Sequence, residues 1–117
     1  MANKIGLLIC ADKSIALVKK GNLKTYVHGH IEAISLSSLH GTEYDNVYAY
    51  FKEMPNQTDK LNEIASEITG FNLKGNCFFC FNDNCETDLT FEDCDKLLIL
   101  AEIHKYSENE EIYNDSL

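Results

Sequence analysis

The chain has 117 residues, of which 44% are hydrophobic and 25% charged, the proportions of an ordinary globular protein of one domain. Its formal net charge is −9 and it contains no arginine, so the side chain best suited to bidentate contacts with phosphates and guanine edges is missing. We therefore expect no direct binding of nucleic acid, because affinity for a polyanion comes mostly from neutralising its phosphates. No apolar run is long enough to span a membrane, and the N-terminal sequence lacks the features of a secretory signal, so we expect a cytoplasmic protein.

The negative charge is concentrated in the last third of the chain. Residues 1–82 hold eight acidic residues and eight lysines, whereas residues 83–117 hold eleven acidic residues and two lysines, which gives the net −9. Residues 107–117 are too polar to fold alone. We expect a single domain over residues 1–106, followed by a flexible acidic tail over 107–117.

Three strands and a helical turn are predicted in the first part of the chain. Continuous apolar runs at 5–10 and 15–18, separated by turn-forming residues, predict a hairpin. Apolar residues at i, i+3 and i+4 within 23–27 predict a short helical turn, which Gly29 ends. The mixed β-branched, small and polar residues that follow predict a central strand, so we expect the fold to be organised around the stretch 27–36.

The middle of the chain predicts a strand followed by a helix. Residues 47–51 alternate, with aromatic side chains on both faces of the predicted strand. Thr58 is a suitable N-cap, and apolar residues recur with helical spacing from Leu61 to a glycine at position 70. These signals predict a helix over residues 58–69.

The last third predicts a buried strand and a second helix. Residues 75–81 form the most apolar run of the chain and have the length of a buried strand. Thr90 and Asp93 have the spacing of a capping box and predict a helix over 90–106. Its predicted apolar stripe consists of Phe91, Cys94, Leu97, Leu98 and Ala101. The fold class predicted is α+β, a mixed or antiparallel sheet of about five strands with two helices on one face.

The five cysteines do not have the arrangement of a strong metal or redox motif. Four of them, Cys77, Cys80, Cys85 and Cys94, could be considered as zinc ligands. However, residues three apart on a strand point to opposite faces, and a redox C-x-x-C pair needs a helix N-terminus to stabilise its thiolate. We predict buried, reduced thiols and no metal or other cofactor.

Few other residues are candidates for chemistry. His28, His30 and Glu32 have period-two spacing and could offer ligands on one side of a strand, although Gly29 interrupts that period. Ser37, Ser38 and His40 share one predicted loop, but no nucleophile elbow or phosphate-binding loop is present. We therefore expect a protein that is not an enzyme, and a small metal- or thiol-dependent enzyme remains an alternative.

The acidic last third is the predicted partner-binding surface. Such a surface complements the basic groove of a nucleic-acid-binding protein, and Tyr106 and Tyr113 could supply apolar contacts within it. The residues predicted to bind the partner are Asp88, Glu92, Asp93, Asp95, Glu102, Tyr106, Glu108, Glu110 and Glu111. The predicted partner is a basic host protein or a protein–nucleic-acid complex.

Several segments together resemble an uncharacterised domain family of phage and plasmid genomes with a V-G-G-x-I-E signature. The matching segments are L-K-T-Y-V-H-G-H-I-E at 23–32, M-P-N at 54–56, a helix ending before Gly70, G-N-C-F-F-C-F at 75–81 and D-L-T-F-E-D at 88–93. The sequence departs from the signature by placing a histidine where its first glycine stands. The resemblance implies an accessory protein of a mobile element, a class that often inhibits host immunity by binding.

Two modes of inhibition follow from this resemblance. One is an acidic, nucleic-acid-mimicking surface that blocks a component of a CRISPR or restriction system in the host cell. The other is a sponge that sequesters a cyclic nucleotide signal at the interface of a homo-oligomer, because a base needs a stacking face and a phosphate needs positive charge. The residues available for the second mode are Lys19, Lys20, Lys24, Tyr26, Tyr48 and Tyr50.

Overall fold

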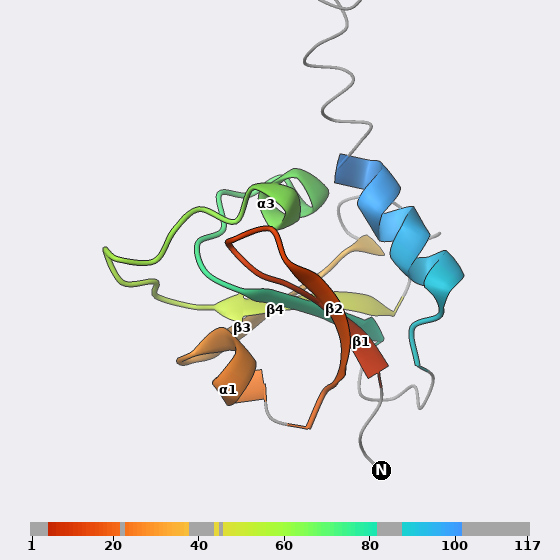
Figure 1. The fold of residues 1–117 in the computed structure, drawn as a ribbon, viewed down its shortest axis with the longest axis horizontal. Coiled ribbons are helices and arrows are strands. Elements are labelled where there is room, and N and C mark those ends of the chain that lie inside the picture. Colours follow the sequence, from red (N-terminus) through yellow and green to blue (C-terminus); the bar gives the residue numbers. More distant parts are fainter. Residues whose placement is uncertain (1–4, 22, 38–43, 45, 82–87, 102–117) are drawn as a thin grey trace, which may run out of the picture.

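The computed structural model describes residues 5–21, 23–37, 44, 46–81 and 88–101, which form a five-stranded sheet with helices on both faces (Figure 1). Each pair of neighbouring strands is antiparallel, and the strand order is β2-β1-β5-β4-β3. The strands are β1 (Ile5–Ile9), β2 (Ile15–Lys19), β3 (Ile31–Ser35), β4 (Val47–Lys52) and β5 (Cys77–Phe81). The predicted α+β class, the five-stranded sheet and the 5–10/15–18 hairpin are confirmed.

The centre of the sheet is β5, and the prediction of a central strand after Gly29 was wrong. β3 lies at the edge of the sheet, whereas β5 lies between β1 and β4. Four of the five residues of β5 are buried, because its aromatic and cysteine side chains find cover on both faces. Glu32 and Ala33 of β3 are exposed, as edge strands permit.

The main hydrophobic core lies between one face of the sheet and two helices. α3 (Glu63–Thr69) contributes Ala65 and Ile68, and the C-terminal helix, residues 91–101, contributes Leu97 among others. These side chains pack with Phe79 of β5 in one buried cluster. Figure 1 shows both helices on this side of the sheet, which confirms the prediction that two helices cover one face.

The opposite face of the sheet is partly covered by α1 (Leu23–Val27), the predicted helical turn. The ring of Tyr26 stacks on that of Phe78 in β5, with centroids 5.9 Å apart. Gly6 in β1 leaves the space that the Phe78 ring occupies, because a Cβ at this position would collide with the ring. Phe78 and Cys80 are therefore fully buried on this second face.

The turn from α1 into β3 depends on two unusual residues. His28 has a positive φ of 66°, the left-handed conformation that usually ends a helix and that glycine adopts most readily. It stands where the V-G-G-x-I-E signature has its first glycine. The close approach lies one residue later, because a Cβ on Gly29 would be 3.1 Å from the stem of Lys52.

The helix predicted from Thr58 begins later than expected. α3 starts at Glu63 and is capped by Asn62, whose side-chain oxygen accepts a hydrogen bond from the Ala65 N–H. Leu61 was predicted to be on the apolar stripe of the helix, but its side chain is exposed. Its backbone forms an isolated antiparallel β-bridge with that of Lys74. The predicted end is confirmed, because Gly70 caps the helix in a left-handed conformation with a φ of 79°.

The C-terminal helix begins with the predicted capping box. The Asp93 N–H donates to the Thr90 hydroxyl at 3.1 Å, and the Thr90 N–H donates to the Asp93 carboxylate at 2.9 Å. Its predicted end at 106 and the predicted tail over 107–117 lie outside the described residues. In the part of the chain that the structure describes, no helix is both long and apolar enough to cross a bilayer.

Candidate functional site

The exposed side of the C-terminal helix combines carboxylates with large apolar side chains. Phe91 was predicted to join the buried stripe, but it is 77% exposed, so that prediction was wrong. It is the first residue of the helix and comes three residues before Cys94, the first buried position. Phe91, Asp95 and Ile99 follow one another at i, i+4 and i+8, which places them on one stripe of the helix. Together with the neighbouring Glu92, these three residues are called the acidic helix surface below.

The two carboxylates of the acidic helix surface are exposed. Within the described residues, the side chains of Glu92 and Asp95 make no hydrogen bond or ion pair. Ile99, on the same stripe, is about half exposed. The helix therefore presents Phe91 and Ile99 with the Asp95 carboxylate between them and that of Glu92 to one side.

Two other carboxylates of the predicted surface support the fold. Asp88 accepts a 2.7 Å hydrogen bond from the Ile5 N–H, and the next residue, Leu89, donates its N–H to the Ile5 carbonyl. These bonds attach the chain entering the C-terminal helix to the first residue of β1. Asp93 is occupied by the capping box. The remaining predicted residues, Glu102, Tyr106, Glu108, Glu110 and Glu111, lie outside the described residues, as does Tyr113.

The second face of the sheet brings together four of the residues considered for nucleotide binding. Tyr48 and Tyr50 of β4 stack with ring centroids 6.4 Å apart, and the Lys20 ammonium lies 5.0 Å from the centre of the Tyr50 ring. Tyr26 reaches the same face from α1 by stacking on Phe78, which pairs with Tyr50 in the sheet.

The two other lysines considered for nucleotide binding are not placed on this face. Lys19 follows the alternation of β2 and belongs to the opposite face. The side chain of Lys24 lies outside the described residues. The stacking residues are therefore assembled, and of the three lysines predicted for this role Lys20 is the one that the described residues place beside them.

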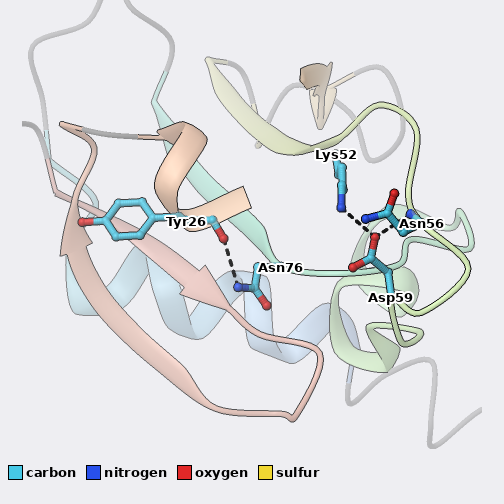
Figure 2. Close-up of polar contacts among 5 residues, drawn as sticks. All are labelled: Tyr26, Lys52, Asn56, Asp59 and Asn76. Atoms are coloured by element: carbon cyan, nitrogen blue, oxygen red, sulfur yellow. Dashed lines mark hydrogen bonds and ion pairs between the residues drawn. The ribbon is translucent and has the colours of Figure 1, made fainter. Parts of the chain in front are cut away.

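A partly buried ion pair lies at the end of β4, and Figure 2 shows its geometry. The Lys52 ammonium, almost fully buried, donates to the Asp59 carboxylate at 2.8 Å, and the same oxygen accepts from the Asn56 N–H at 2.6 Å. These two hydrogen bonds hold the pKa of Asp59 below its usual value. The pair closes the loop after β4, and its hydrogen-bonding groups are used within the fold.

Two asparagines, Asn62, which is buried, and Asn76, which is partly buried, connect segments that are distant in the sequence. The Asn76 amide donates to the Tyr26 carbonyl at 3.0 Å, as drawn in Figure 2, and its oxygen accepts from the Ala11 N–H. Asn62 donates to the carbonyls of Ile9 and Gly75. The sequence carried no signal for these roles, because each bond joins residues whose proximity depends on the complete sheet. These asparagines position α1, α3 and the hairpin and are not available for a ligand.

The cysteines are arranged as structural residues. Cys77 and Cys80 are both buried, and the alternation of β5 points them to opposite faces of the sheet. Burial raises the pKa of the Cys77 thiol far above its usual value, and burial together with Asp93 and Asp95 raises that of Cys94. Cys85 lies outside the described residues.

The other candidates for metal binding or catalysis are not assembled into a site by the described residues. Within these residues, no group of three or more His, Cys, Asp or Glu side chains is close enough to hold a metal ion. The left-handed conformation of His28 breaks the period-two spacing on which a shared face with His30 depended. The Ser37 hydroxyl lies 2.9 Å from that of Ser35, and Ser38 and His40 lie outside the described residues.

Comparisons of the chain with known proteins add no relative, since no protein-family model, curated protein or solved structure matches it. The resemblance to the V-G-G-x-I-E family therefore stays a prediction. The candidate site rests on the geometry of the described residues, among which the acidic helix surface is the most distinctive exposed feature.

Proposed function

We propose that this protein is a non-enzymatic binding protein of a phage or other mobile element, which inhibits a host defence system by occupying a basic surface of one of its components. The observation that carries the proposal is the exposure of Phe91 and Ile99 beside Glu92 and Asp95 on one helix. Aromatic side chains are enriched at protein interfaces, and charged groups on such a surface steer association with an oppositely charged partner.

The local balance of charge favours a basic protein as the partner. The residues from 83 onwards carry the whole net charge of −9, and the described helix contains one lysine, Lys96. Carboxylates at helical spacing can replace the phosphates that a nuclease or a CRISPR effector normally binds, and the protein lacks the arginines that would let it bind those phosphates itself. Inhibition by occupying the nucleic-acid groove follows from this complementarity.

A plaque assay tests the proposal directly. The chain is expressed in bacteria that carry a CRISPR or restriction system, and the efficiency with which a targeted phage forms plaques is measured. We expect the chain to restore plaque formation, and we expect Phe91→Ser combined with Asp95→Asn to abolish the restoration.

Met54→Ser combined with Glu53→Gln is the matched control. Met54 is 79% exposed and Glu53 is exposed, but both belong to the loop after β4 and not to the acidic helix surface. Restoration by the control and not by the Phe91 variant supports the proposal. Failure of the parent chain against every such system, or equal activity of both variants, contradicts it.

A second candidate function is favoured by the assembly of Tyr26, Tyr48 and Tyr50 with Lys20 on the second face. Aromatic rings and an ammonium group can stack on the base and pair with the phosphate of a cyclic nucleotide. Thermal unfolding with a panel of cyclic dinucleotides measures this: a ligand that binds with micromolar affinity raises the melting temperature of the parent but not that of Tyr50→Ala. Unchanged melting temperatures across the panel contradict this function.

A further inference from the structure

β2 is an edge strand of the sheet with exposed apolar side chains, and among the described residues no strand pairs with its outer side. Its pairing with β1 is continuous over all five residues, with no bulge and no proline. Proteins usually protect such an edge with a charge within the strand, a bulge, a proline or a covering segment. β2 carries one charge, Lys19 at its end, and α1 packs against β5, β4 and β3 on the other side of the sheet. This edge is therefore suited to strand pairing.

The hydrogen-bond phase of the hairpin shows which groups of β2 point outwards. The Cys10 N–H donates to the Ser14 carbonyl at 2.9 Å, and bonded and non-bonded pairs alternate along an antiparallel ladder. Within β2, the backbone groups of Ala16 and Val18 therefore bond to β1. The backbone N–H and C=O groups of the other three residues, Ile15, Leu17 and Lys19, point away from β1 to the outer edge of the sheet.

Two of these three residues, Ile15 and Leu17, expose apolar side chains on the face of the sheet that carries the main core. Ile15 is 41% exposed and Leu17 is 38% exposed, although isoleucine and leucine usually become buried when a sheet face offers cover. Ile15 and Leu17 thus have both outward backbone groups and exposed side chains. A strand added at this edge would form hydrogen bonds with those backbone groups and cover those side chains.

We propose that the occupant of this edge is β2 of a second copy of the chain, paired antiparallel about a twofold axis at Leu17. Two Leu17 residues then form a hydrogen-bonded pair, and each Lys19 lies opposite Ile15 of the second copy. The pairing forms about six backbone hydrogen bonds and joins the two sheets into one of ten strands. The four exposed Ile15 and Leu17 side chains become neighbours on one face, so each covers apolar surface of another.

The charges along the hairpin select the antiparallel orientation. Asp12 lies at the turn before β2, and Lys19 and Lys20 lie at its other end. Lys13, next to Asp12, is paired with Glu63 at 3.7 Å, so the turn end keeps a net negative charge. Antiparallel pairing brings this end of each copy beside the lysines of the other, whereas parallel pairing would set like charges together.

Sedimentation equilibrium over a range of protein concentrations tests the dimer. An interface of one strand edge and four apolar side chains is small, so we expect reversible association in the micromolar range. Leu17→Lys sets two like charges opposite each other at the axis, and we expect it to raise the dissociation constant at least about tenfold. Met54→Lys, which adds the same charge at an exposed methionine, is the control and should dimerise like the parent.

Two further variants keep the test decisive if Leu17→Lys folds poorly by circular dichroism. Leu17→Pro removes an N–H that points outwards and leaves the ladder to β1 intact, so it should be folded and monomeric. Leu17→Cys should form a disulfide-linked dimer under oxidised glutathione, because α-carbons of a hydrogen-bonded pair lie about 5.5 Å apart, whereas Met54→Cys and the parent should not. A parent that stays monomeric at about 300 µM, or a dimer that Leu17→Lys and Leu17→Pro leave unchanged, overturns the proposal.

Discussion

Asn62 is the polar residue on which the arrangement of the core depends most, and its replacement by alanine gives a quantitative test of the fold. The side chain is fully buried and makes three hydrogen bonds. Its amide group donates to the carbonyl of Ile9 in β1 at 2.8 Å and to that of Gly75, before β5, at 2.9 Å. Its oxygen caps α3 through the Ala65 N–H at 3.1 Å. One side chain therefore joins β1 and the segment before β5 to α3.

The magnitude follows from the groups that Asn62→Ala leaves without a partner. Loss of an N-cap costs about 1 kcal/mol, and a buried carbonyl deprived of its donor costs about 1–3 kcal/mol. Because water can reach the partly buried Gly75 carbonyl, we expect a total loss of about 3–5 kcal/mol. This is a large share of the roughly 5–15 kcal/mol that stabilises a typical domain.

Urea denaturation followed by circular dichroism measures this loss. With a slope of about 1.5 kcal/mol per molar urea, the midpoint should fall by roughly 2–3 M for Asn62→Ala. Asn62→Ser keeps a capping oxygen but loses the two amide donors, so its midpoint should lie between those of the alanine variant and the parent. Asn72→Ala, at an exposed asparagine, is the control and should change nothing. A loss below about 1 kcal/mol for Asn62→Ala, or a serine variant as stable as the parent, would refute the reasoning.

Three further predictions concern charge, backbone conformation and thiol reactivity. The lowered pKa of Asp59 means that its pairing with Lys52 stabilises the protein above the usual carboxyl value of 3.8 and that this stabilisation is lost as the pH falls through the lowered value. Urea midpoints of Lys52→Met and the parent should therefore differ more at about pH 6 than at about pH 2, and a constant difference would show that the pairing does not shift this carboxyl. At the left-handed position 28, His28→Gly should keep or raise the melting temperature, whereas His28→Val should lower stability by about 1–2 kcal/mol; the opposite order would argue against that backbone conformation. Finally, Cys77 should resist alkylation in the folded protein and react once urea unfolds it, which mass spectrometry of its peptide detects; rapid labelling without urea would contradict its burial.

The parts of the fold that were predicted from the sequence are those with local signals. The hairpin, the strand at 75–81, the helix stop at Gly70 and the capping box at Thr90 each depend on residues within a few positions of one another. The order of strands in the sheet depends on residues far apart in the sequence. The stretch 27–36 was wrongly placed at the centre of the sheet, because its mixture of polar and apolar residues does not show whether a strand has neighbours on both sides or on one. The start of α3 was predicted too early because Thr58 also has the sequence features of a cap, and the choice of Asn62 depends on its bonds to β1 and to residue 75.

The acidic character of the candidate site was predicted from the sequence, but the residues that form its exposed surface were predicted only in part. The charge of the last third is visible in the sequence, and the structure presents Glu92 and Asp95 as exposed carboxylates. The exposure of Phe91 was missed, because its spacing from Cys94 is compatible with a buried stripe and only the structure shows that nothing described covers its ring. Asp88 and Asp93 were grouped with the binding surface, although hydrogen bonds give both a role in the fold.

The measurement that tests the central claim most directly is the salt dependence of binding between the chain and a purified defence nuclease that it inhibits in the plaque assay. We predict that the affinity of the parent falls as ionic strength rises and that Glu92→Gln combined with Asp95→Asn flattens this dependence. Phe91→Ser should weaken binding by about 2 kcal/mol at every salt concentration while the protein stays folded, because its ring is exposed in the free protein. An affinity that ignores ionic strength, or variants that bind as tightly as the parent, would contradict an interface formed by the acidic helix surface.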